Sequence, residues 1–181
     1  VVTGCRERGV LVHVDAAQAA GRVPLDFGAL GADLVSVSGH KLGGPAGTGV
    51  LLVRRGLRIR PLIVGGEQER ARRAGLENVV GAIGLAVSEL DVAAESATQA
   101  RLAAGLRDAL EAVEGVEVFG HPTERLPHLV CAGIADIEPQ AVLLGLDRRR
   151  IRAHSGSACA SEGLEPSPVL EAMGVDAHRS L

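Results

Sequence analysis

Residues 34–53 constrain the fold more than any other stretch of this sequence. They read Leu-Val-Ser-Val-Ser-Gly-His-Lys-Leu-Gly-Gly-Pro-Ala-Gly-Thr-Gly-Val-Leu-Leu-Val. The apolar and β-branched residues at each end predict two strands, and the glycines between them predict a tight turn. Ser38, His40 and Lys41 lie where the first strand ends, so their side chains are expected at the edge of a sheet. Glycines in such a turn also let a ligand approach the backbone closely.

A second segment repeats this arrangement. Residues 10–14 are apolar and predict a short buried strand, which ends at Asp15. In open α/β sheets, ligands bind outside the carboxyl ends of the strands, so polar side chains there are expected to converge. For Asp15 alone, capping of the turn that follows is an equally good interpretation. The side chains expected to converge are those of Asp15, Gln18, Ser38, His40 and Lys41.

The rest of the N-terminal half fits an α/β fold. Residues 24–30 predict a short helix that connects the strands over 10–14 and 32–38, and strands that alternate with helices favour a mainly parallel sheet. Residues 65–75 are charged and lack apolar periodicity, which predicts a loop. Residues 79–113 predict one long helix, broken near Ser96, that could link two domains.

The C-terminal half predicts a second, smaller sheet. Residues 115–120 and 128–134 are typical of two strands, and residues 139–146 predict an amphipathic helix. A loop follows, which contains Ser-Gly-Ser-Ala-Cys159, and then a helix after Pro168.

Composition excludes several functions. Aromatic residues make up only 1% of the chain and its net charge is −3, so neither base stacking nor a strong positive field favours nucleic-acid binding. The arginines at 148, 149, 150 and 152 are interpreted as a solvated helix end. No apolar run approaches the roughly 20 residues needed to span a bilayer.

The cysteines and histidines do not predict a metal centre. His13, Asp15 and His40 lack the spacing of a zinc site, so no metal is expected. The three cysteines are widely spaced and odd in number, which favours a reducing compartment. Cys131 lies in an apolar strand and is expected to be a buried residue, whereas Cys159 lies in a loop of small residues that favours a reactive role.

Four segments resemble motifs of the cysteine desulfurases, which belong to the class V aminotransferase group of pyridoxal phosphate enzymes. The segments follow one another in the family's order and approximate spacing from end to end of the chain, and together they are far more specific than any one of them. They are residues 13–18 (His-Val-Asp-Ala-Ala-Gln), 36–41 (Ser-Val-Ser-Gly-His-Lys), 65–78 (beginning Gly-Gly-Glu-Gln and ending Gly-Leu-Glu-Asn) and 155–161 (Ser-Gly-Ser-Ala-Cys-Ala-Ser).

The resemblance implies a role for each of the expected site residues. Lys41 would carry pyridoxal phosphate through its amine and act as base and acid on the substrate, while Ser38 and His40 would bind the cofactor phosphate. Asp15 would pair with the pyridinium nitrogen, and Gln18 would contact the ring hydroxyl oxygen. Cys159 would take the sulfur of L-cysteine as a persulfide and leave alanine. Lys41 and Cys159 are therefore the catalytic residues that the resemblance implies.

The resemblance also implies the fold and the partners. Residues 1–95 would form the C-terminal part of a fold type I large domain that binds pyridoxal phosphate, and residues 96–181 most of a small α+β domain. The whole protein would be a cytoplasmic homodimer without direct nucleic-acid or membrane contacts. The loop around Cys159 is similar to the long-loop subgroup, so the sulfur acceptor would be an iron-sulfur scaffold or a tRNA-thiolation relay.

The chain also departs from this family. Leu76 stands where the family usually has a threonine whose hydroxyl reaches the cofactor phosphate of the partner subunit. The family's N-terminal half has no counterpart in this sequence, which predicts a fragment with an incomplete active site. The alternatives are another class V enzyme, such as a selenocysteine lyase or an aminotransferase of small amino acids, and an inactive truncated chain that only binds partners. The Cys159 loop argues against an aminotransferase.

Overall fold

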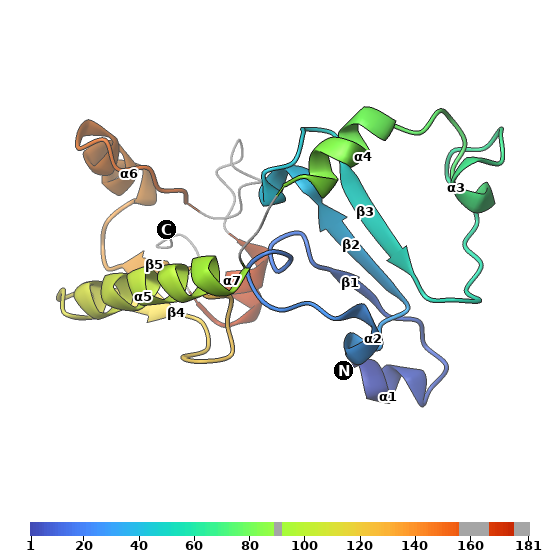
Figure 1. Ribbon diagram of the computed structural model, residues 1–181. Helices are drawn as coiled ribbons and strands as arrows, with labels where there is room; N and C mark the ends of the chain where they lie inside the picture. Colours follow the sequence, from blue (N-terminus) through green and yellow to red (C-terminus); the bar gives the residue numbers. More distant parts are fainter. Residues whose placement is uncertain (89–91, 156–166, 176–181) are drawn as a thin grey trace. The chain divides into compact units, whose positions relative to one another are not determined.

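The computed structural model describes residues 1–88, 92–155 and 167–175. The chain divides into two units, Val1–Ala97 and Thr98–Leu181, and each contains a sheet of its own (Figure 1). Within the described ranges, no helix combines the length and the apolar character that crossing a lipid bilayer requires.

The sheet of the first unit has three strands in the order β1 (His13–Asp15), β2 (Leu34–Ser38) and β3 (Gly49–Val53). β1 and β2 are parallel, as the helical connection predicted, whereas β3 returns antiparallel to β2 after the glycine-rich turn. The expected α/β fold is thus confirmed, with a mixed sheet in the described part of this unit.

The core of this unit lies on one face of the sheet. Val35 is fully buried there with Ala16 and Ala32, and α2 (Phe27–Leu30) packs Phe27 and Leu30 against them. Alternate residues of a strand point to opposite faces, so Ser36 and Ser38 lie on the face away from this core. β2 itself adds Val37 to this core, and the neighbouring strands add Val14 and Leu52.

β1 is shorter than the sequence predicted. Its register pairs His13 with Leu34, the first residue of β2, so residues before His13 have no partner strand. Val10 and Leu11 are therefore 53% and 57% exposed instead of buried.

Asp33 joins the starts of β1 and β2 to the end of β3. Its Oδ2 accepts the Val12 N–H at 2.8 Å, and its Oδ1 accepts from Arg54 Nε at 2.6 Å. The Asp33 backbone carbonyl also accepts the Arg54 N–H, at 2.9 Å. The hydrogen bond from Val12, and then the Arg54 guanidinium, hold the pKa of Asp33 below its usual value.

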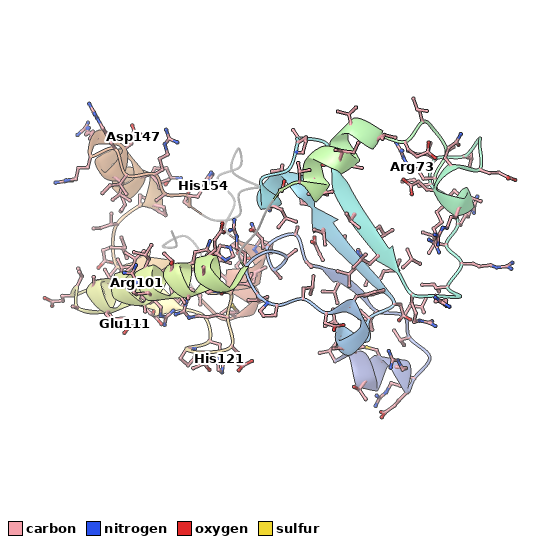
Figure 2. All side chains as sticks on the ribbon, in the orientation of Figure 1. Arg73, Arg101, Glu111, His121, Asp147 and His154 are labelled. Atoms are coloured by element: carbon pink, nitrogen blue, oxygen red, sulfur yellow. The ribbon has the colours of Figure 1, made fainter. Side chains whose placement is uncertain are left out.

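The helices correct two predictions. The predicted loop 65–75 contains one short turn, α3 (Gln68–Ala71), in which Glu69 and Arg70 have left-handed backbones. The predicted long helix is two helices, α4 (Val79–Ala86) and α5 (Val92–Glu111), so the break precedes Ser96, which lies inside α5. The chain begins with α1 (Val2–Arg6). Charged side chains such as Arg101 and Glu111 project outward from α5 (Figure 2).

The second unit contains the predicted pair of strands. β4 (Val116–Phe119) and β5 (Cys131–Ile134) are antiparallel, followed by α6 (Pro139–Arg148) and α7 (Pro168–Ala172). Cys131 is half-buried in β5, and this burial raises the pKa of its thiol.

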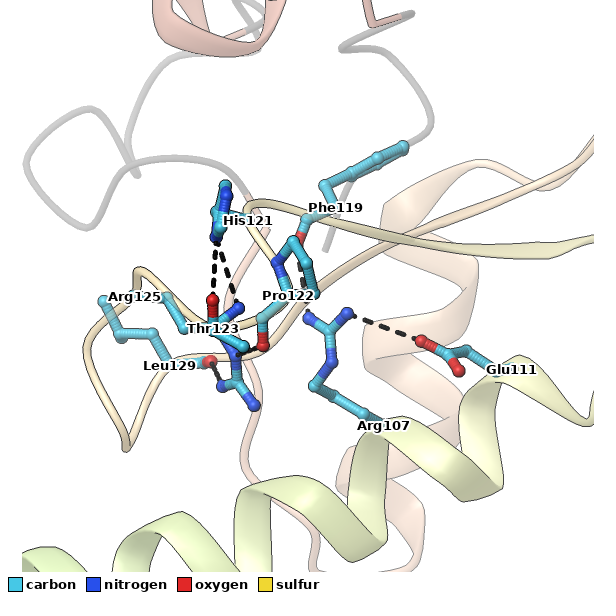
Figure 3. Close-up of polar contacts among 8 residues, drawn as sticks. All are labelled: Arg107, Glu111, Phe119, His121, Pro122, Thr123, Arg125 and Leu129. Atoms are coloured by element: carbon cyan, nitrogen blue, oxygen red, sulfur yellow. Dashed lines mark hydrogen bonds and ion pairs between the residues drawn. The ribbon is translucent and has the colours of Figure 1, made fainter.

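Side-chain contacts order the connection between β4 and β5 (Figure 3). His121 Nδ1 accepts the N–H groups of Thr123 at 3.2 Å and Glu124 at 2.8 Å, which caps this turn. Arg107 of α5 donates to the Phe119 carbonyl at 3.4 Å and pairs with Glu111 at the same distance. His121 therefore orders the turn after β4, and Arg107 joins α5 to the last residue of β4.

Candidate active site

The parallel pairing of β1 and β2 brings their polar ends to one edge of the sheet. Asp15 pairs in register with Ser36, and the Ala16 N–H donates to the Ser36 carbonyl at 2.9 Å. Since Ser38 is two residues beyond Ser36, Asp15 and Ser38 lie at the same edge and on the same face. The two sequence segments predicted to converge are therefore neighbours in the fold.

Lys41 lies in a single 3-10 turn, η1 (Gly39–Leu42), that begins directly after β2. The Ser38 hydroxyl and His40 Nδ1 are 3.0 Å apart across the start of this turn. Either group can be the donor in this hydrogen bond, and the other then keeps its own O–H or N–H to donate to an anion.

Gly39 fixes the turn against the strand that follows. Its N–H donates to the Thr48 carbonyl at 2.9 Å, and its own carbonyl accepts the Gly44 N–H at 3.0 Å. A Cβ at Gly39 would run into the Thr48 hydroxyl and lie 2.9 Å from the Thr48 carbonyl oxygen. Only glycine fits this position without a shift of the backbone.

α4 packs closely on the far side of the same loop. A Cβ at Gly81 would lie 2.7 Å from Thr48 Cγ2, and one at Gly84 would lie 2.6 Å from Pro45 Cγ. The Asn78 side chain caps this helix by accepting the Gly81 N–H at 2.9 Å. The loop that carries Lys41 is therefore held between β2 and a glycine face of α4.

Arg22, which no sequence motif contains, also holds this loop. Arg22 lies in the turn that follows β1, and its Nη2 donates to the Lys41 backbone carbonyl at a distance of 3.4 Å. No local motif marks Arg22, because the contact joins segments 19 residues apart.

Several functional groups at this edge remain available. Asp15 Oδ1 accepts the Ala17 N–H at 2.9 Å, so Asp15 does cap the turn. Its Oδ2 has no hydrogen-bond partner among the described residues. Within the same ranges, Lys41 Nζ and the Gln18 amide make no side-chain hydrogen bond or ion pair. A carboxylate oxygen, an amide and an amine are thus open to a ligand.

The remaining expected residues do not join this cluster in the described ranges. Cys159 lies outside them, and Leu76 is 89% exposed on the chain that leads to α4. His13, two residues before Asp15 in β1, has its Nε2 3.1 Å from the Ser36 hydroxyl. No group of three or more potential metal ligands gathers anywhere in residues 1–88, 92–155 and 167–175.

Lys41 is distinctive in the composition as well as in the fold. Of the 19 lysine and arginine residues in the chain, it is the only lysine. The other 18 basic residues are arginines, whose guanidinium groups stay protonated, so Lys41 carries the only side-chain amine of the sequence. The arrangement is suited to bind an anionic ligand through Ser38 and His40 and to react with a carbonyl group through Lys41.

The aminotransferase class-V model matches residues 1–178. The chain is 49% identical over 177 residues to cysteine desulfurase 2 of Trichormus variabilis, covering 94% of this chain and 44% of that protein. It is 45% identical over 177 residues to the cysteine desulfurase NifS of Azotobacter vinelandii, covering 93% of this chain and 43% of NifS.

A solved structure agrees with these relatives. The NifS-like protein from Rickettsia africae superimposes with a TM-score of 0.84 at 30% identity, over 99% of this chain and 49% of that protein. The chain thus spans less than half the length of each of these three proteins. Because the family model matches almost the whole sequence, the chain belongs to the aminotransferase class-V family.

Proposed function

We propose that the protein is a pyridoxal phosphate-dependent cysteine desulfurase, which converts L-cysteine to L-alanine and transfers the sulfur to one of its own cysteines. The observation that carries this proposal is the single lysine of the chain, which lies at a strand end beside Ser38, His40 and Asp15. The 49% identity to a cysteine desulfurase supports it.

The donor set at the sheet edge fits the cofactor of this family. We assign the Lys41 amine to the bond with the cofactor aldehyde, and Ser38 and His40 to its phosphate. Asp15 is assigned to the ring nitrogen, since its Oδ2 accepts no described hydrogen bond, and Gln18 to the ring hydroxyl oxygen. When bound, the cofactor supplies an electron sink that stabilises negative charge on the substrate α-carbon.

The chain's own residues then hold and move protons. The Asp15 carboxylate would keep the ring nitrogen of a bound cofactor protonated. The Lys41 amine would take the α-proton of the substrate and return a proton later. Arg22, Gly39 and the glycine face of α4 act on Lys41 indirectly, because they fix the backbone of its loop.

Cys159 is proposed as the sulfur acceptor within the chain. Its thiolate attacks the substrate sulfur, and the bond between that sulfur and the substrate β-carbon breaks. The electron pair of that bond, with one added proton, becomes a C–H bond of alanine, and the sulfur stays on Cys159 as a persulfide. The step needs no external oxidant or reductant.

The remaining proposals concern the whole protein. We assign residues 1–95 to the large cofactor-binding domain and residues 96–181 to the small domain, and we expect a homodimer. A sulfur acceptor of the iron-sulfur scaffold or tRNA-thiolation type would take the persulfide sulfur. A reducing compartment, the cytoplasm, is supported by the free thiols of Cys5 and Cys131.

Alanine release from L-cysteine tests this function. The whole protein, loaded with pyridoxal phosphate, should form alanine and a protein persulfide in equal amounts during the first turnover. Cys159→Ser should abolish the persulfide, whereas Cys131→Ser should retain it, because Cys131 is half-buried in β5 and its thiol pKa is raised. Absence of alanine from the loaded wild-type protein would sink the proposal.

A further inference from the structure

Four exposed arginines follow one another at the C-terminal end of α6, and we call Arg148, Arg149, Arg150 and Arg152 the arginine surface. In the described part of the chain, none of the four forms an ion pair. Asp147, the acidic residue next to them in the sequence, lies near the end of α6 among nitrogen-tipped side chains that project outward (Figure 2). The surface therefore concentrates four positive charges next to one carboxylate in the sequence, that of Asp147.

The helix end accounts for only part of this charge. Arg149 Nη1 donates to the Gly145 carbonyl at 3.4 Å, and the helix dipole interacts favourably with positive side chains in the last helical turn. Arg150 and Arg152 lie beyond α6, which ends at Arg148, so capping does not explain them.

The backbone at Arg150 adds an independent observation. The Arg150 N–H donates to the Asp147 backbone carbonyl at 2.7 Å, and the Ile151 N–H donates to the Leu146 backbone carbonyl at 3.0 Å. These two bonds form the Schellman motif, which ends a helix. Arg150 takes the left-handed position of this motif, with φ 60°. Glycine takes the same position after α1 and after α7, at Gly9 and Gly174. An arginine therefore stands where the backbone favours glycine, as is common at functional sites.

Apolar neighbours indicate what kind of partner fits. Leu144, one helical turn before Arg148, is 62% exposed, and Ile151 between the arginines is 51% exposed. Arginine combined with exposed apolar side chains is typical of protein interfaces. The chain offers no aromatic platform here for nucleic-acid bases, since both of its phenylalanines lie elsewhere in the sequence.

We propose that the arginine surface, with Leu144 and Ile151, is a docking surface for an acidic segment of a partner protein. Its charge would attract such a segment, and its apolar residues would pack against it. Arg152 precedes Cys159 closely in the sequence. If the proposed function holds, on which this identification rests, the partner is the protein that takes the sulfur.

Peptide binding tests the surface without any need for turnover. The probe is a fluorescein-labelled peptide of alternating glutamate and leucine, measured by fluorescence anisotropy with the chain. The triple variant R148Q/R150Q/R152Q should bind it about tenfold more weakly, as expected for the loss of three exposed charge pairs. The matched control R8Q/R55Q/R101Q removes the same charge from three exposed arginines that lie far apart in the sequence, and it should change the affinity less than about twofold.

Two further arms separate the alternatives. The single substitution Arg150→Gly keeps the fold and should by itself weaken binding of the peptide. Circular dichroism of each variant verifies folding. Equal losses in the triple variant and its control would overturn the proposal, because attraction would then be nonspecific. Tighter binding of a single-stranded oligonucleotide than of the peptide would also overturn it. Neither result depends on desulfurase activity, so this proposal and the proposed function fail separately.

Discussion

Asp33 shows how one side chain sets the frame in which the site lies. Each of its carboxylate oxygens accepts a hydrogen bond, one from the backbone before β1 and one from Arg54 after β3. Because the carboxylate form makes these bonds, folding lowers the pKa of Asp33. The residue thereby couples the stability of the site-bearing sheet to pH.

The pH dependence has a definite sign. A carboxyl pKa lowered by folding stabilises the protein above the pKa of the unfolded chain, about 3.9 for aspartate, and this stabilisation is lost as pH falls through the folded value. We expect Asp33→Asn to lower the denaturant midpoint at pH 7 and to flatten the decline in stability on the acid side. Asp136→Asn, at an exposed aspartate, is the control. Parallel pH profiles for wild type and Asp33→Asn would contradict the assignment.

Gly39 is the second residue on which the site depends. The Cβ of Gly39→Ala would meet the Thr48 hydroxyl and carbonyl, so we expect a loss of about 1–3 kcal/mol in the free energy of unfolding. Gly105→Ala should instead gain about 0.5–1 kcal/mol, because it lies within α5 with no atom within 4 Å of an added Cβ. Urea unfolding measures both, and a Gly39→Ala variant as stable as wild type would show that the loop is not confined.

Among the elements, the predicted break of the long helix near Ser96 was wrong, because the sequence does not mark where α4 ends and α5 begins. The apolar periodicity of residues 79–113 continues through the gap between α4 and α5, so a break could not be located from it. The Ser88 hydroxyl bonds back to the Gly84 carbonyl at 3.2 Å, near the end of α4, whereas Ser96 lies inside α5. A serine therefore occurs both near the end of α4 and inside α5, so the presence of a serine does not by itself predict where a helix ends.

Arg150 at the end of α6 gives a prediction at this scale. Arg150→Gly should raise the free energy of unfolding by up to about 1 kcal/mol, because glycine takes the left-handed conformation without strain. The greater flexibility of glycine in the unfolded chain offsets part of this gain. Arg149→Gly removes the same charge at an ordinary backbone position and should destabilise the helix end. Thermal unfolding compares the two, and equal shifts in Tm would refute the backbone explanation.

At the scale of the whole molecule, the order of motifs predicted more than any single pattern did. Strands that end in Asp15 and in Ser38 predicted a shared sheet edge, and the parallel pairing of β1 and β2 produces it. The hydrogen bonds of Asp33 with Val12 and of Arg22 with the Lys41 carbonyl could not be predicted. Each joins residues about 20 positions apart, and no local sequence pattern encodes such contacts. The roles of Asp15, Gln18, Ser38, His40, Lys41 and Cys159 stay predictions.

Covalent mapping of the cofactor tests whether Lys41 is the residue that binds pyridoxal phosphate. The chain would be incubated with pyridoxal phosphate, treated with borohydride to fix any amine-cofactor bond, and analysed by peptide mass spectrometry. Since Lys41 is the only lysine, the sole competing amine is the N-terminus. We expect label at Lys41 in the folded chain, less label at Lys41 in the urea-denatured chain, and none at this position in Lys41→Arg. Labelling of Lys41 that is no greater in the folded than in the denatured chain would contradict it.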